Sequence, residues 1–190
     1  CEFYDVGINT RCNAECPFCY VNASGKGIDY PDICETWKKW MATYWEKKEK
    51  GITLTNKPFQ IAIGSTGEPT LHPEFCNFLQ TVHTTGVVPN YTTNGIILSD
   101  WNKPGAPNYK LANKILAYTA AHVGGVAVSF GNKNLRKRAR AAIEGLIELG
   151  NTNINIHHII STKESVDEFI TEWIRYGDSI LYHVLLPLMP

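Results

Sequence analysis

Short apolar runs alternate along this chain with longer stretches whose apolar residues recur at spacings of three and four. The first pattern is typical of buried strands and the second of amphipathic helices. Regular alternation of the two predicts βαβ units with right-handed crossovers and a parallel sheet, in an α/β fold. An open doubly wound sheet and a barrel both fit, and in both the chemistry lies at the carboxyl ends of the strands. The six expected strands are residues 2–9, 59–63, 87–92, 123–130, 154–160 and 181–188.

The expected helices follow these strands. The first opens at Tyr30-Pro31 and ends at Gly51, and the last is preceded by a capping box at Ser165-Val166-Asp167-Glu168. Three further helices are expected around residues 75–82, 111–118 and 135–149.

The composition predicts a globular protein without a strong electrostatic field. The 190 residues are 44% hydrophobic, and 18 basic residues balance 18 acidic ones. No charge excess favours nucleic acid or a membrane surface. We find no leader and no apolar run long enough to span a bilayer, so we expect a cytoplasmic protein without a membrane partner.

Three of the six cysteines lie close together. Cys12, Cys16 and Cys19 have the spacing C-x3-C-x2-C and follow the first expected strand. Thiolates bind soft metals, and three on one short loop can hold an iron–sulfur cluster while leaving one iron without a protein ligand. The alternatives are a structural zinc site, for which the sequence has no second cysteine pair, and a chance group of reduced thiols.

With Phe18 before the last cysteine, this stretch resembles the radical SAM signature C-x3-C-x-aromatic-C. The resemblance implies a partial, TIM-like (β/α)6 barrel with a [4Fe-4S] cluster on Cys12, Cys16 and Cys19. It also implies S-adenosylmethionine (SAM) on the fourth iron and reductive cleavage to methionine and a 5′-deoxyadenosyl radical, which abstracts hydrogen from a substrate. Such an enzyme is oxygen-sensitive and needs a low-potential electron donor such as flavodoxin or ferredoxin.

The same resemblance implies a SAM site at the ends of later strands. The stretch from Gly64 to Pro69 takes the place of the family's Gly-Gly-Glu motif, with Thr66 where the first glycine is usual. Gly67 would let the backbone approach the ligand, and Glu68 would bind its ammonium. The other implied contacts are Asn94 and Ser129 for the ribose and carboxylate, and Phe18, Tyr20, Ile156 and Leu186 around the adenine.

Each of these residues also has a structural interpretation. Gly67-Glu68 could be an ordinary strand-to-helix turn, Asn94-Gly95 a turn that tolerates positive φ, and Ile156 or Leu186 plain core. His157 and His158 point to opposite faces of one strand, so a metal pair is not expected. The basic run at residues 136–140 is interpreted as a solvated helix face, with nucleic-acid contact as the alternative.

We expect residues 1–190 to form one radical SAM core domain, truncated at one or both ends. The substrate is interpreted by analogy as a peptide or protein. A nucleic acid or small metabolite is the alternative substrate, and a non-catalytic metal-binding module is the alternative class.

Overall fold

Six parallel strands form one curved sheet in the computed structural model, which describes residues 3–51, 60–151 and 153–187. The spatial order of the strands, β1-β2-β3-β4-β5-β6, is also their order in the chain. In the described part of the chain no pairing joins β1 to β6, so the barrel is incomplete. The expected α/β fold, a partial (β/α)6 TIM-like barrel, is confirmed. The strands are β1 (Phe3–Val6), β2 (Gln60–Ile63), β3 (Val88–Thr93), β4 (Gly125–Ser129), β5 (Ile154–Ile160) and β6 (Tyr182–Pro187).

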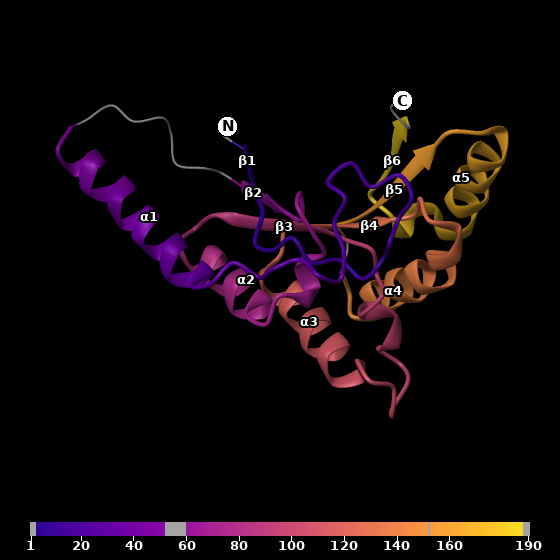
Figure 1. Cartoon of the computed structure of the whole chain (residues 1–190), viewed down its shortest axis with the longest axis horizontal. Helices are drawn as coiled ribbons and strands as arrows, with labels where there is room; N and C mark the ends of the chain where they lie inside the picture. Colours follow the sequence, from indigo (N-terminus) through magenta and orange to yellow (C-terminus); the bar gives the residue numbers. More distant parts are fainter. Residues whose placement is uncertain (1–2, 52–59, 152, 188–190) are drawn as a thin grey trace.

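The five α-helices of the described residues lie on the outer side of this sheet (Figure 1). All five were expected from the periodicity of the sequence. The expected strand residues Glu2, Phe59 and Leu188 lie outside the described residues, as does Cys1. No helix in the described ranges has the length and apolar character needed to cross a membrane. The helices are α1 (Ile33–Glu49), α2 (Phe75–Thr84), α3 (Tyr109–His122), α4 (Arg136–Glu148) and α5 (Lys163–Tyr176).

The two faces of the sheet differ in polarity. In β2–β5 the residues that face the helices are mostly buried, so the core lies between these strands and the helices. The opposite, inner face carries polar groups near the amino ends of the strands, where the Asn90 Nδ2 donates to the Gln60 Oε1 at 3.2 Å. The fully buried helix-facing strand residues include Ile61, Ile63, Tyr91, Val126, Val128, Ile154 and Ile156.

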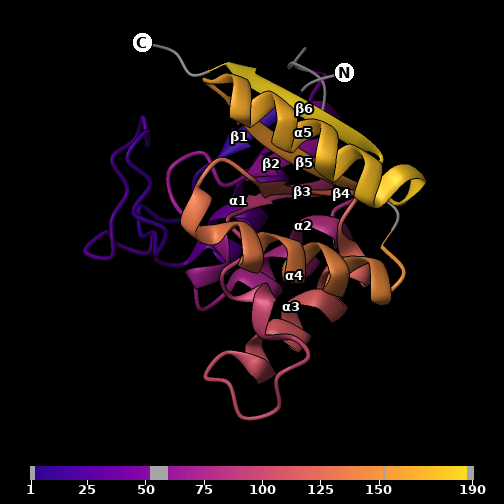
Figure 2. The same cartoon turned by 90° about the vertical axis from the view of Figure 1, so that its right-hand side faces the viewer.

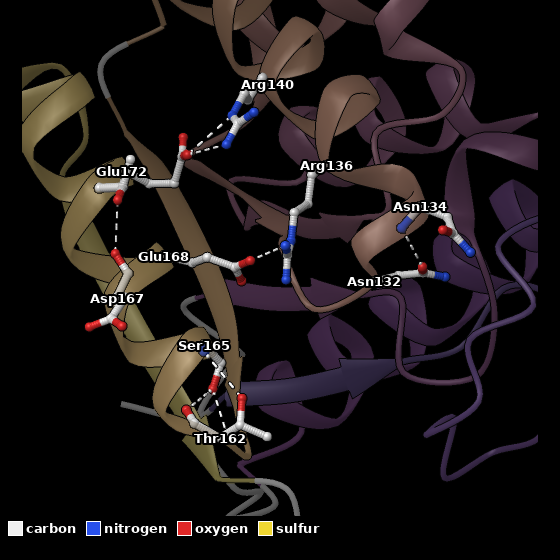
Figure 3. A network of polar contacts seen from close by, with 10 residues as sticks. Asn132, Asn134, Arg136, Arg140, Thr162, Ser165, Asp167, Glu168 and Glu172 are labelled. Carbon is white, nitrogen blue, oxygen red and sulfur yellow. Dashed lines mark hydrogen bonds and ion pairs between the residues drawn. The ribbon is translucent and has the colours of Figure 1, made fainter.

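The start of α5 differs from the expected capping box. Thr162 is the N-cap: its hydroxyl accepts from the Ser165 N–H at 3.3 Å, and the Ser165 hydroxyl accepts from the Thr162 N–H at 3.0 Å. The helix therefore starts one turn earlier than predicted, and Glu168 is free for another role (Figure 3). A Thr-x-x-Ser pair satisfies the same orphan backbone donors as the expected Ser-x-x-Glu pair.

Glu168 and Glu172 of α5 bind two arginines of the basic run on α4 (Figure 3). Arg136 pairs with Glu168, and the Arg140 Nη2 lies 2.6 Å from the Glu172 Oε1, whose side chain is fully buried. The expectation of a solvated basic face was therefore wrong for these two arginines, because α5 packs beside α4. Lys137 and Arg138 are exposed.

His157 and His158 lie on opposite faces of β5, as expected. His158 is buried on the helix side, where its ring lies near Phe130 and Phe169. Its Nε2 lies 3.0 Å from the Nδ1 of His183 on β6. Burial lowers the pKa of His158 to about 4, and His183 and His157 act in the same direction.

This buried imidazole predicts a loss of stability in acid. An unfolded histidine has a pKa near 6.5, so between pH 6.5 and about 4 the unfolded chain binds more protons than the folded one. The free energy of unfolding therefore falls as the pH falls through this window. Between pH 7 and 4.5 the free energy of unfolding of wild type should fall by about 2 kcal/mol more than that of His158→Gln, measured by urea unfolding. The difference between wild type and Gln80→Asn, a change between two side chains that do not titrate on an exposed face of α2, should stay constant; a constant difference for His158→Gln would contradict the assignment.

Candidate functional site

The three clustered cysteines lie on a long loop between β1 and α1, residues 7–30, which we call the cysteine loop. Figure 2 shows this loop projecting beyond one end of the strands. The loop is held closed by backbone hydrogen bonds between its two arms, from the Thr10 N–H to the Ile28 carbonyl at 2.8 Å and from the Cys12 N–H to the Ser24 carbonyl at 2.9 Å. The cysteines therefore stand on a braced segment.

The first arm of the cysteine loop is joined to the segment that follows β2. The Glu68 N–H donates to the Arg11 carbonyl at 2.7 Å, the Asn9 Nδ2 donates to the Glu68 carbonyl at 2.8 Å, and the Thr66 hydroxyl donates to the Asn9 carbonyl at 2.7 Å. Gly67 lies between these contacts. A Cβ at Gly67 would lie 2.7 Å from the Arg11 carbonyl oxygen, so the absence of a side chain permits the close approach.

The Glu68 carboxylate points into the protein and joins the ends of β2 and β3. Its side chain is buried, and its Oε1 accepts from the Thr70 hydroxyl at 2.5 Å and the Thr93 hydroxyl at 2.7 Å. Its Oε2 accepts from the Asn94 N–H at 2.7 Å. Burial raises the pKa of Glu68, while the hydrogen bonds from Thr70, Asn94 and Thr93 act in the opposite direction. The Glu68 carboxylate therefore holds the segment after β2 against the end of β3.

The thiols of Cys12, Cys16 and Cys19 are free and only partly exposed. Burial raises the pKa of Cys12, and the neighbouring Cys16 thiol raises it further. Burial also raises the pKa of Cys16, and the neighbouring Cys19 thiol acts in the same direction. Among the described side chains, no three His, Cys, Asp or Glu residues are gathered as a formed metal site, so the three thiols are not yet arranged around one ion. The type of donor, three free thiols on one loop, is the one that iron–sulfur clusters use.

Two asparagines at strand ends contact these thiols. The Asn94 Nδ2 lies 3.8 Å from the Cys12 Sγ, and the Asn132 Nδ2 lies 3.6 Å from the Cys16 Sγ. Asn94 directly follows β3, and Asn132 lies shortly after β4. The carboxyl ends of β2, β3 and β4 thus all touch the cysteine loop.

Phe18 and Tyr20 lie in different surroundings. A Cβ at Gly131, just beyond β4, would lie 3.0 Å from the Phe18 Cζ and 2.3 Å from the Ile159 Cγ1, so Phe18 and Ile159 flank this glycine. Tyr20 is 87% exposed, and its hydroxyl donates to the Ser65 carbonyl at 3.1 Å.

The remaining expected residues divide between the two faces of the sheet. Ser129 shares the inner face with His157, its partner in the β4–β5 register, and Leu186 shares it with Ile159. Ile156 is fully buried on the helix face, away from Phe18. The structure thus brings Thr66, Gly67, Glu68 and Asn94 to the cysteine loop and does not bring Ile156 there.

The sequence interpretation missed four residues of this site. Thr70 and Thr93 bind Glu68, Asn132 contacts Cys16, and Ile159 lies near Phe18. The position of Asn132 shortly after a predicted strand was an available signal, because the carboxyl ends of parallel strands meet at one edge. Nothing in the local sequence distinguished Ile159 from Ile156.

Comparison with known proteins yields structural matches only. No protein-family model matches the chain, and no curated protein matches its sequence. The crystal structure of Streptococcus suis SuiB bound to S-adenosylmethionine superposes with a TM-score of 0.66 at 14% identity, covering 99% of this chain and 41% of that one. SuiB bound to precursor peptide SuiA gives a TM-score of 0.63 at 15% identity, covering 98% of this chain and 39% of that one. The chain thus spans about two fifths of these proteins, and at such identities the likeness shows the fold.

Gly67→Ala should loosen the cysteine loop. The new Cβ would meet the Arg11 carbonyl oxygen at 2.7 Å and the Asn9 carbonyl oxygen at 2.8 Å, so the backbones must separate. We expect hydrogen exchange at the Glu68 amide to become at least about tenfold faster. Gly25→Ala is the matched control in the same loop, because a Cβ there meets nothing within 4 Å. Unchanged exchange in Gly67→Ala would contradict the close approach.

Glu68→Gln should destabilise the fold. The substitution places an NH2 group among hydroxyl and backbone N–H donors, so at least one of these buried groups loses its acceptor. We expect the free energy of unfolding to fall by about 1–3 kcal/mol. Glu148→Gln, at an exposed position near the end of α4, should leave it unchanged. Equal free energies of unfolding for the two variants would show that the Glu68 carboxylate does not stabilise the contact between the ends of β2 and β3.

Proposed function

We propose that this chain is the core domain of a radical SAM enzyme. The observation that carries the proposal is the placement of a C-x3-C-x2-C loop against the ends of β2, β3 and β4, with its three thiols free. The parallel sheet and its likeness to a SAM-bound SuiB structure support the proposal. In barrels of parallel strands the reacting groups gather at the carboxyl ends of the strands.

Cys12, Cys16 and Cys19 would hold a [4Fe-4S] cluster, and SAM would bind beside it. When bound, the cluster supplies one electron to the sulfonium, and SAM yields methionine and a 5′-deoxyadenosyl radical. The chain's own residues bind and orient the cofactor and exclude water from it. Thr66 and Gly67 would place backbone groups near the methionine moiety, and Glu68 would act by fixing this segment to β3 as well as through any contact with the ammonium.

The adenine and ribose would lie along the inner face of β4–β6. Ser129 would supply a polar group there, and Phe18 and Leu186 would border the ring. Tyr20, whose hydroxyl binds the Ser65 carbonyl, and Asn94, whose amide is held by Ile96 and Asn13, would border SAM at the ends of β2 and β3. Ile159, beside Phe18, is a better-placed wall than Ile156, which would support β5 from the helix side. A low-potential donor such as flavodoxin or ferredoxin would supply the electron, and the oxygen-sensitive protein would work in the reducing cytoplasm.

We further propose a peptide or protein as the substrate. Two features support this proposal: within the described residues the barrel does not close between β1 and β6, and a structure of similar fold was solved with its precursor peptide. The reaction would begin with abstraction of a hydrogen atom from that peptide.

Replacing one cluster cysteine tests the proposed function. The protein is reconstituted with iron and sulfide without oxygen, then given SAM and dithionite. Wild type and Cys34→Ala, whose thiol is on α1, should bind about four irons and form 5′-deoxyadenosine. Cys16→Ala should lose most of its iron and reduce product formation by at least about a hundredfold, because the cluster loses a ligand.

Two results would contradict this function. Full iron retention in Cys16→Ala would place the metal elsewhere. Zinc in place of iron, without 5′-deoxyadenosine, would favour a structural metal module.

A further inference from the structure

Asn94 and Asn132 form the same side-chain-to-backbone turn at the ends of the neighbouring strands β3 and β4. In each case the side-chain oxygen accepts from the backbone N–H two residues later, at 2.9 Å from Ile96 and 3.0 Å from Asn134. Figure 3 shows the Asn132 turn. This turn fixes which end of the amide points outward, since the oxygen is engaged and the NH2 group faces the cysteine loop.

Both NH2 groups are anchored to the cysteine loop beside a cysteine. The Asn94 Nδ2 donates to the Asn13 Oδ1 at 2.9 Å and lies 3.8 Å from the Cys12 Sγ. The Asn132 Nδ2 donates to the Ala14 carbonyl at 3.3 Å and lies 3.6 Å from the Cys16 Sγ. An NH2 group has two hydrogens, so one can serve the loop and the other the sulfur.

The surroundings make these donors effective. Asn94 is buried, and its backbone N–H donates to the Glu68 carboxylate, which fixes the residue from the other side. Asn132 is held between its own turn and the Ala14 carbonyl. A hydrogen bond of a preorganised donor to a charged acceptor is stronger than one in water, where the donor must be reoriented.

We propose that Asn94 and Asn132 donate hydrogen bonds to the Cys12 and Cys16 thiolates of the cluster and thereby raise its reduction potential. The inference rests on the proposed function. Reduction adds one electron, and hence one negative charge, shared by iron and sulfur; a donor at sulfur stabilises this more negative state more than the oxidised one. The electron comes from the external low-potential donor.

A redox titration with serine variants tests this role. Asn94→Ser and Asn132→Ser keep a side-chain oxygen for the i+2 N–H, so the turn is retained, but the hydroxyl is too short to replace the amide donor. The reconstituted proteins are titrated without oxygen against titanium(III) citrate, and the reduced cluster is measured by electron paramagnetic resonance. Asn153→Ser is the matched control, because the Asn153 amide donates to the Gly124 carbonyl at the opposite ends of the strands.

We expect each serine variant to lower the equilibrium constant for reduction about fivefold, a shift of about 40 mV to lower potential for one electron. Asn132→Asp keeps the length and the turn but replaces the donor with a charged oxygen, so its potential should fall below that of Asn132→Ser. Asn153→Ser should match wild type.

The outcomes separate this inference from the proposed function. Potentials equal to wild type in both serine variants, with full iron content, would overturn the inference and leave the function standing. Loss of the cluster from both variants would also overturn it, because the asparagines would then be needed to assemble the loop. A wild type that binds no iron would overturn the function and the inference together.

Discussion

The hydrogen bond from the Glu68 N–H to the Arg11 carbonyl is the contact on which the rest of the site depends. It joins two segments that are 57 residues apart in sequence, the first arm of the cysteine loop and the turn after β2. Gly67 allows the approach, and the buried carboxylate of Glu68 extends the connection to β3. A long loop that would otherwise cost considerable conformational entropy is thus fixed at the edge of the sheet.

The incomplete barrel has two faces of different polarity. Its helix-facing side is apolar and buried over β2–β5, which supplies the stabilising burial, while the inner side is polar at the amino ends of the strands. The inner side is therefore free to carry functional groups at the carboxyl ends. Within the described residues β1 and β6 do not pair, so the sheet ends in two separate edge strands.

The elements were predictable from sequence because strand and helix periods are local properties. Side-chain direction was not predictable. Glu68 turns inward because Thr93, at the end of the next strand, and Asn94, directly after it, provide donors, and no local pattern reveals such partners. Ile156 and Ile159 differ by an odd number of residues and so lie on opposite faces of β5. Since both faces of this strand carry apolar residues, the sequence could not show which one meets Phe18.

Mössbauer spectroscopy of the protein reconstituted with ⁵⁷Fe, with and without SAM, tests the central claim most directly. Three cysteine ligands on one loop predict a four-iron cluster in which one iron differs from the other three. Addition of SAM should change the signal of that iron alone. A spectrum with four equivalent irons, or one that SAM leaves unchanged, would contradict an open coordination site at this edge of the sheet.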